Sequence, residues 1–138
     1  MCAGNKVGEI DNTLTVNGSQ IEYYGDPDKT LLSFLRDEIN ITSPKDGCAP
    51  QAACGCCVVD LDGKAVLSCV KKMQDVAGKS ITTLEGISDY RKKVYANAFV
   101  NAGGLQCGFC IPGIVMQADA LINKKCDPKR SEVEKALT

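Results

Sequence analysis

The first half of the chain alternates apolar and polar residues in short runs, a pattern that predicts a small β-sheet. Asn17-Gly18 and Asp62-Gly63 each interrupt such an alternation, and both dipeptides are typical of two-residue β-hairpin turns. Each turn therefore predicts a pair of antiparallel strands. The predicted strands are residues 14–16, 21–23, 58–61, 65–67 and, after the second hairpin, 80–84.

Between the two hairpins the apolar residues recur at near-helical spacing. Leu31, Leu32, Leu35 and Ile39 fall on one face of such a helix. The preceding segment, residues 26–28 (DPD), supplies a turn and a helix N-cap. We expect this helix to lie across the sheet and to bury its apolar face against it.

From residue 88 onward the apolar period becomes helical. A first helix is predicted to end at Gly103-Gly104, and a second to begin at Pro112, since proline suits the first helical turn. We expect these two helices to pack on each other. A third helix is predicted from Ser131, where Ser131 and Glu134 form a capping-box pattern. Because the sequence stops soon afterwards, we expect this part to be incomplete at its C-terminus.

These periods divide the chain into two predicted domains, residues 1–85 and residues 86–138. The 16 basic and 17 acidic residues give a net charge of -1, which leaves no electrostatic footprint for nucleic acid or an anionic membrane. No apolar run is long enough to span a bilayer, and the first residues lack the apolar core of a secretory signal. We therefore expect a reduced, cytoplasmic protein.

Cysteine is the most unusual part of the composition, with nine residues in 138 and no histidine. Such a count indicates disulfides, zinc or iron-sulfur clusters, and the expected reducing location disfavours disulfides. The absence of histidine excludes Rieske-type centres and zinc sites that mix cysteine with histidine. Six of the cysteines form two groups. The first group is Cys48, Cys54, Cys57 and Cys69, and the second is Cys107 and Cys110.

The spacing of the first group suits a [2Fe-2S] cluster. Four thiolates must converge on a small core, which favours three ligands on one tight loop and a fourth from a neighbouring strand. Cys69 follows the second hairpin and can return beside the loop. Gly47 and Gly55 allow the backbone conformations of such a loop and bring amide N–H groups close to the sulfur atoms.

The cysteines and their surroundings resemble the iron-sulfur subunit or domain of the molybdenum hydroxylases, the xanthine dehydrogenase and aldehyde oxidoreductase family. The resemblance covers the chain from about residue 10 onward. It is carried by residues 30–36 (TLLSFLR), 45–48 (KDGC), 54–57 (CGCC), 69, and 106–113 (QCGFCIPG).

The resemblance implies an α+β fold with an N-terminal β-grasp lobe, like a plant-type ferredoxin, and a C-terminal helical-bundle lobe. Each lobe would hold one [2Fe-2S] cluster. The family's second cluster takes two ligands from a CxxC and two from a later CxC that this sequence lacks. Cys107 and Cys110 would then be half of a site completed by residues outside the chain. Gln106 resembles the glutamine that touches the pterin cofactor in this family.

The sequence departs from the family pattern at the first group. The segment between Cys48 and Cys54 is one residue longer than in the family, and Cys56 stands where the family has a small residue. Either Cys56 or Cys57 can be the third ligand, and the spacings favour Cys57. Cys126 has no neighbour at ligand spacing, and we interpret it as an incidental thiol.

The function that the resemblance implies is electron transfer within an oxidoreductase. Electrons would pass from a molybdenum-pterin centre on a large partner subunit, through the two clusters, to FAD on a flavin subunit or to another acceptor. The chain itself offers no general base, nucleophile or nucleotide-binding glycine loop. Two alternatives remain open: a free-standing ferredoxin-like carrier, and a zinc-tetrathiolate module that pairs Cys54 and Cys57 with Cys107 and Cys110.

Overall fold

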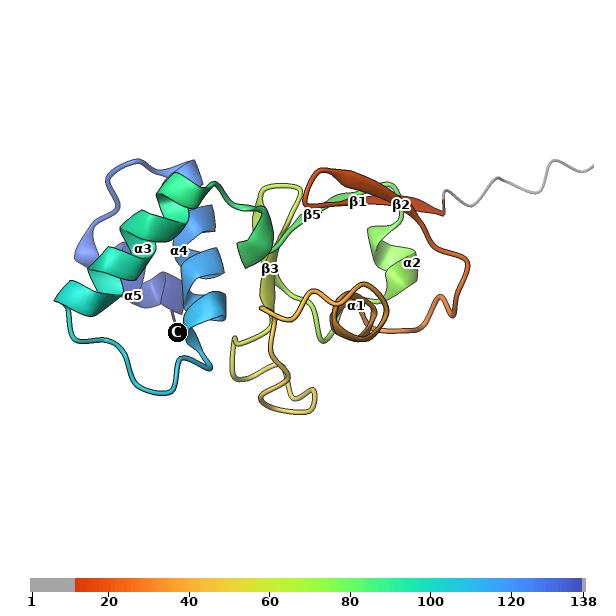
Figure 1. The fold of residues 1–138 in the computed structure, drawn as a ribbon, viewed down its shortest axis with the longest axis horizontal. Helices are drawn as coiled ribbons and strands as arrows, with labels where there is room; N and C mark the ends of the chain where they lie inside the picture. Colours follow the sequence, from red (N-terminus) through yellow and green to blue (C-terminus); the bar gives the residue numbers. More distant parts are fainter. Residues whose placement is uncertain (1–11, 138) are drawn as a thin grey trace, which may run out of the picture.

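One five-stranded sheet forms the first half of the molecule, and three longer helices form the second (Figure 1). The computed structural model describes residues 12–137. The strands lie in the order β2-β1-β5-β3-β4. β5 runs parallel to β1 and antiparallel to β3. The strands are β1 (Thr13–Val16), β2 (Ser19–Glu22), β3 (Val58–Leu61), β4 (Lys64–Leu67) and β5 (Ser80–Thr82).

Both predicted hairpins are confirmed, because β1 pairs antiparallel with β2 and β3 with β4. The turn residues have positive φ angles of 51° at Asn17, 83° at Gly18, 51° at Asp62 and 80° at Gly63. Two consecutive positive φ angles define the turn whose twist matches that of the flanking strands, and Asn, Asp and Gly tolerate them best. The local sequence is therefore sufficient to fix both turns.

The predicted first helix is present but differs in its start and its form. It consists of α1 (Leu31–Ser33) followed by a π-helical segment, η1 (Phe34–Glu38). The N-cap is Thr30, whose Oγ1 accepts a hydrogen bond from Ser33 N at 3.2 Å, so the cap predicted at residues 26–28 is wrong. The carboxylate of Asp26 instead accepts from the N–H of Asp28 at 2.9 Å and closes a local turn.

This helical segment lies across the sheet, as predicted. Leu31, Phe34 and Leu35 are 0–2 % exposed and share one core with Val16 and Ile81 from the sheet. A short helix that the periodicity did not predict, α2 (Met73–Val76), closes the same core. Burial of each large apolar side chain of this kind stabilises the fold by about 1.5–3 kcal/mol.

The helical half begins with a 3-10 turn, η2 (Leu84–Gly86), which takes the place of the last predicted strand residues. The next helices are α3 (Asp89–Asn101), α4 (Ile111–Lys124) and α5 (Arg130–Leu137). α3 ends just before Gly103-Gly104, as predicted, and α4 begins at Ile111, one residue before the predicted Pro112. α5 starts one residue early, so Ser131 lies inside it and the predicted capping box is wrong. Glu132 satisfies the free N–H of Lys129 instead, at 2.7 Å.

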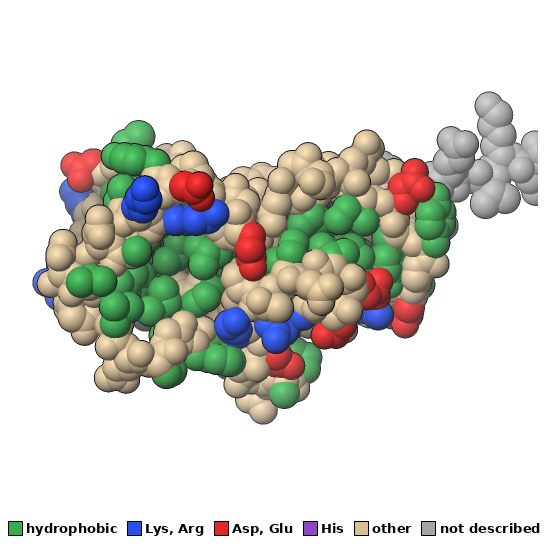
Figure 2. Space-filling model, viewed as in Figure 1, with side chains coloured by type: hydrophobic (Ala, Val, Ile, Leu, Met, Phe, Trp, Pro, Cys, Tyr) green, Lys and Arg blue, Asp and Glu red, His purple; other side chains and the backbone are tan. Residues whose placement is uncertain are grey.

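α4 is the helix that joins the two halves. Its residues Val115 and Met116 pack with Val58 of β3 in a second apolar core, and Tyr95 and Phe99 of α3 cover that core from outside. The predicted packing of the two helices is therefore confirmed. α3 itself has no buried residue, and on the face drawn in Figure 2 apolar side chains remain visible over the helical half.

The structure is thus a mixed α/β fold, with α1, η1 and α2 packed on the sheet and the three longer helices at one end of it. In the part of the chain that the structure describes, no helix combines the length and apolar character that a membrane crossing requires. Acidic and basic side chains are interspersed on the face shown in Figure 2 and form no large patch of one sign. This distribution agrees with the net charge of -1.

Candidate metal centre

A loop between η1 and β3 carries most of the first cysteine group, and hydrogen bonds from one side chain and one backbone N–H hold its ends. The guanidinium of Arg36 donates to the carbonyl oxygens of Thr42 at 3.0 Å and Pro44 at 2.8 Å. Lys45 N donates to Cys56 O at 2.9 Å and closes the loop. Because both ends are fixed, the sulfur atoms between them are brought into one small region.

Cys48 accepts several backbone hydrogen bonds at its sulfur. Backbone N–H groups of Ala53, Cys54 and Gln51 donate to its sulfur, and the Cys54 side chain contacts it as well. These donors lower the pKa of the Cys48 thiol to about 7. A thiolate held by several N–H dipoles is the form that binds metal, so the loop stabilises the ligand state of Cys48.

Cys57 and Cys69 form a second contacting pair, on the buried side of the loop. They are 1 % and 4 % exposed and share a small apolar cluster with Leu32. Burial, followed by the contact with Cys57, raises the pKa of Cys69 to about 12, and Cys48 is near enough to add to this effect. The N–H of Ala52 donates to the Cys69 sulfur and acts in the opposite direction.

Two pairs of cysteines are the arrangement that a two-iron cluster requires, because each iron takes two protein ligands. Cys48 contacts Cys54, and Cys57 contacts Cys69. This pairing fits a [2Fe-2S] cluster.

Cys56 occupies a different position from Cys57. It is 6 % exposed, its sulfur lies 3.7 Å from the carbonyl oxygen of Cys54, and its thiol contacts the Cys54 side chain. Burial, with these contacts and the nearby Cys110 and Cys57, raises the pKa of Cys56 to about 11. The fourth predicted ligand, Cys69, has its side-chain contact with Cys57. Cys57, which contacts Cys69, suits the third ligand position better.

The two glycines singled out in the sequence have separate reasons to be glycine. A Cβ on Gly47 would lie 3.0 Å from the sulfur of Cys54, 3.5 Å from that of Cys56 and 3.2 Å from Cε1 of Phe109. A side chain there would push the sulfur atoms apart. Gly55 has a φ of +68°, which a residue with a Cβ adopts only with strain.

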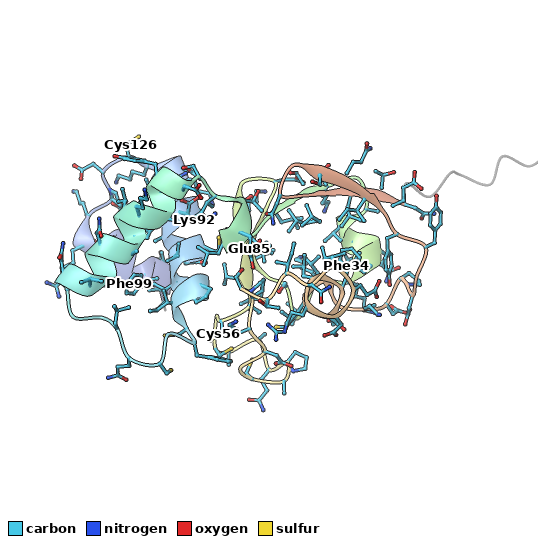
Figure 3. The ribbon with its side chains drawn as sticks, in the orientation of Figure 1. Phe34, Cys56, Glu85, Lys92, Phe99 and Cys126 are labelled. Atoms are coloured by element: carbon cyan, nitrogen blue, oxygen red, sulfur yellow. The ribbon has the colours of Figure 1, made fainter. Side chains whose placement is uncertain are left out.

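The second group, Cys107 and Cys110, lies in the loop between α3 and α4. Both residues are exposed, and so is Gln106 beside them. Cys110 is the N-cap residue of α4. Among the described residues, the second group contains no cysteine other than these two. Cys126 is exposed and lies at the opposite end of the helical half from Cys56, as Figure 3 shows.

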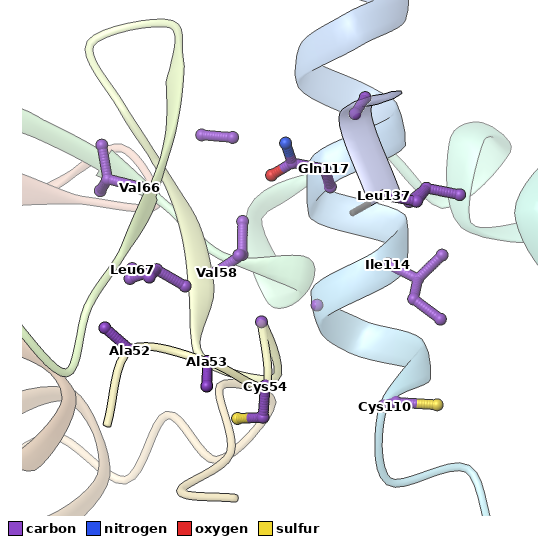
Figure 4. A pocket seen from close by; sticks show the side chains of 14 residues that line it. Ala52, Ala53, Cys54, Val58, Val66, Leu67, Cys110, Ile114, Gln117 and Leu137 are labelled. Atoms are coloured by element: carbon purple, nitrogen blue, oxygen red, sulfur yellow. The ribbon is translucent and has the colours of Figure 1, made fainter. Parts of the chain in front are cut away.

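The two cysteine groups meet across a close backbone approach that sequence reasoning missed. The backbone of Gly113, in the first turn of α4, packs against Gly55 and Cys56 so closely that an added Cβ would lie 2.2 Å from Gly55 O. An open cavity of about 420 Å³ lies beside this contact, with Cys54 on one wall and Cys110 on the other (Figure 4). The position of Gly113 after a CxxC was the only sequence signal available for this contact.

Two protein-family models match adjacent parts of the chain. The model described as "2Fe-2S iron-sulfur cluster binding domain" matches residues 14–82. The model described as "[2Fe-2S] binding domain" matches residues 83–138. Together they cover both cysteine groups.

Curated relatives include an aldehyde oxidoreductase of Megalodesulfovibrio gigas, 41 % identical over 126 residues, which are 90 % of this chain and 14 % of that protein. The nicotinate dehydrogenase small FeS subunit of Eubacterium barkeri is 34 % identical over 133 residues, 96 % of this chain and 84 % of that subunit. In the solved structure of quinoline 2-oxidoreductase from Pseudomonas putida 86, one chain matches with a TM-score of 0.81 and 32 % identity, covering 91 % of this chain and 77 % of that chain. The chain thus spans most of the separate subunits and a small part of the longer oxidoreductase.

Proposed function

The chain belongs to the iron-sulfur subunits and domains of the molybdenum hydroxylases, and on that premise we propose that it relays single electrons between a molybdenum-pterin centre and a second acceptor. The relatives are components of oxidoreductases, and this chain is part of one. Two [2Fe-2S] clusters supply the one-electron redox chemistry when bound. The chain's own residues bind, orient and shield them.

The observation that carries this function is the contact of four thiols in two pairs. We propose that Cys48 and Cys54 bind one iron of the first cluster and that Cys57 and Cys69 bind the other. The pairs differ in environment: Cys54 is exposed and Cys48 partly so, whereas Cys57 and Cys69 are buried. The buried pair keeps water from one side of the site, and the exposed pair leaves the other side near the surface for a partner.

For the second cluster we propose Cys107 and Cys110 as two of the four ligands, with the other two outside these 138 residues. Cys110 at the start of α4 would place a thiolate at the positive end of a helix dipole, where negative charge is stabilised by about 0.3–1 kcal/mol. Gln106, exposed next to Cys107, is the residue that we propose for contact with the pterin.

The domain limits follow from the same proposal. Residues 1–85 would form a β-grasp, ferredoxin-like domain, and residues 86–138 a helical cluster-binding domain. The strand order β2-β1-β5-β3-β4, with α1 packed across it, supports the first assignment. The boundary between the two family matches, at residues 82 and 83, supports the division.

The proposed partner is a large molybdenum-pterin subunit or domain that holds the catalytic centre, and a flavin subunit is the proposed acceptor. The apolar residues Leu105 and Phe109, which are 51 % and 45 % exposed, adjoin the second cysteine group in the sequence and support a protein partner there. Since the ligands are thiolates that oxidise readily, we place the chain in the reducing cytoplasm.

The test is to purify the chain anaerobically together with its partner subunits and to measure iron, acid-labile sulfide and zinc per chain. We expect about four irons and four sulfides, two of each per cluster, with no zinc. Absorption and electron paramagnetic resonance (EPR) spectra of the reduced sample should then show two distinct [2Fe-2S] species. One zinc per chain with no sulfide would refute the electron-transfer function.

A further inference from the structure

Glu85 lies in η2, the connector between the sheet and the helical half, and Figure 3 shows it between the two. Its carboxylate accepts three hydrogen bonds. Ser43 donates two of them, from its backbone N at 3.0 Å and from its Oγ at 2.5 Å. Thr83 Oγ1 donates the third, at 2.6 Å. Hydrogen bonds to an ionised acceptor are short and about twice as strong as neutral ones.

The Ser43 contact links Glu85 to the cysteine loop. Ser43 stands just before Pro44, which is buried, and Lys45, whose N–H donates to Cys56 O at 2.9 Å. A displacement of Ser43 would therefore be transmitted through two residues to the backbone between Cys54 and Cys57. Glu85 is 42 residues away from Ser43 in the sequence, so only the folded structure makes this link.

The other side of Glu85 is linked to the sheet and to α3. Thr83 is fully buried, and Asn17 fixes it by accepting from Thr83 N at 2.9 Å and donating to Thr83 Oγ1 at 3.0 Å. Lys92 of α3 donates to the backbone carbonyl of Glu85 at 3.0 Å. The carboxylate of Glu85 thus joins Ser43 to Thr83, whereas its backbone carbonyl makes the contact with α3.

The carboxylate is suited to this role in its charged form. Partial burial by itself would raise the pKa of Glu85, but the hydrogen bonds from Ser43 and Thr83 outweigh it and lower the pKa below its usual value of 4.5. Glu85 is therefore ionised at neutral pH and accepts all three bonds at full strength.

We propose that Glu85 is a positioning residue that holds the helical half in a fixed orientation against the cysteine loop and thereby sets the separation of the two clusters. The proposal rests on the electron-transfer function argued above. The close approach of Gly113 to Gly55 is one point of contact between the halves. The two halves also pack together where α4 meets β3, and Leu84 and Ile87, on either side of Glu85, belong to that apolar core. The Glu85 carboxylate adds a polar contact between this connector and the segment that leads into the cysteine loop. Cys56 lies at the first contact, and Figure 3 shows Glu85 well separated from Cys56.

The experiment compares Glu85→Gln, Glu85→Ala and Ser43→Ala in the purified complex, with Glu22→Gln as the matched control. Glu22 is an exposed carboxylate on β2 that accepts one hydrogen bond from Tyr24 at 3.0 Å. Each sample is analysed for iron and sulfide, for the magnetic interaction between the two reduced clusters by EPR, and for the rate of electron passage between them. The last two measurements depend on the separation of the clusters and not on their content.

We expect Glu85→Ala to keep both clusters but to slow electron passage between them severalfold, because the rate of electron tunnelling falls steeply as the distance between the clusters increases. The EPR interaction should weaken in parallel. Ser43→Ala should act in the same direction but less strongly, because it removes only the bond from Ser43 Oγ. The variant that carries both changes should be no slower than Glu85→Ala alone, since Glu85→Ala already removes that bond. Glu22→Gln should match the unmodified chain.

Unchanged EPR interaction and unchanged rate in Glu85→Ala, with iron retained, would overturn the proposal. If Glu85→Ala loses iron, Glu85→Gln and Ser43→Ala decide, because they keep most of the packing. A complex of the unmodified chain that lacks two clusters would refute the electron-transfer function, and this inference with it. The iron and sulfide assay of the unmodified chain therefore separates the two kinds of failure.

Discussion

Replacement of Gly113 by alanine tests whether the two halves of the molecule meet as closely as the structure indicates. Gly113 is buried in the first turn of α4. An ideal Cβ there would lie 2.2 Å from Gly55 O, 3.0 Å from Cys56 Cα and 3.1 Å from Gly55 C. All three are backbone atoms, so no rotamer change can make room. α4 or the cysteine loop would have to move.

The size of the effect follows from two opposing terms. In an open helical position alanine is about 1 kcal/mol more favourable than glycine. Here the contact of 2.2 Å must open to at least 3.0 Å, a movement of about 0.8 Å, before it reaches the shortest separation that real Cβ atoms show. Overpacking of this kind costs about 1–3 kcal/mol. Because the obstacle is backbone, we take the upper part of that range and expect a net loss of about 1–2 kcal/mol.

The assay is thermal unfolding of the cluster-loaded protein followed by circular dichroism, with iron measured on the same samples. A loss of about 1–2 kcal/mol corresponds to a midpoint lowered by about 3–7 °C for a chain of this length. Gln117→Ala is the control, because Gln117 lies one turn further along α4 and lines the same cavity. Both residue types favour helix, so its midpoint should stay nearly unchanged.

A midpoint that is unchanged or raised in Gly113→Ala would refute this reasoning. It would mean that α4 and the Gly55 loop separate without loss, and that the helix propensity of alanine decides the sign. A lowered midpoint with iron content retained would show that the packing of the two halves, and not the clusters themselves, carries the effect.

Three further outcomes are expected. Cys57→Ala should lower iron from about four to about two per chain, whereas Cys56→Ala should keep about four; the reverse pattern in the iron assay would make Cys56 the ligand. Asp119→Asn should destabilise the fold by about 1–3 kcal/mol in chemical denaturation, because the buried carboxylate of Asp119 forms an ion pair with Arg91 of α3, which is one-third exposed. An unchanged denaturation midpoint would contradict that role. Burial, then the hydrogen bond to Asp119, raises the pKa of Tyr95 to about 12. The protonated phenol should therefore stabilise the fold fully below pH 10, and this stabilisation should be lost as the pH rises through 12. Ultraviolet titration of the phenol at its ordinary pKa would contradict this.

The hairpins and the main helices were predictable because their determinants are local. Asn17-Gly18 and Asp62-Gly63 adopt positive φ angles that few other dipeptides tolerate. Pro112 in the first turn of α4 and the positive φ of Gly103 after α3 act in the same way. In each case the residue types themselves exclude the competing backbone conformations, so no distant contact is needed to decide the outcome.

The local errors arose where several residues could serve. Asp26, Asp28 and Thr30 are all good N-cap residues, and the position of Leu31 in the core selects Thr30. Ser131 likewise does not cap α5, because the helix begins at Arg130 and the carboxylate of Glu132 accepts the hydrogen bond from the free N–H of Lys129. The π-helical form of η1 also follows from tertiary packing, since nothing in its sequence favours i to i+5 bonding.

The cysteine spacing by itself determined which residues could be ligands, because short loops bring thiols together whatever the rest of the chain does. Only the tertiary structure decided which thiols contact each other: Cys48 with Cys54, Cys57 with Cys69, and Cys56 facing Cys110. The link from Glu85 to Ser43 and the approach of Gly113 to Gly55 likewise join residues far apart in sequence. Local patterns fix turns, helices and loop composition, whereas the relation between the two cysteine groups exists only once α4 has packed on β3, because that packing depends on shape and burial across the whole chain.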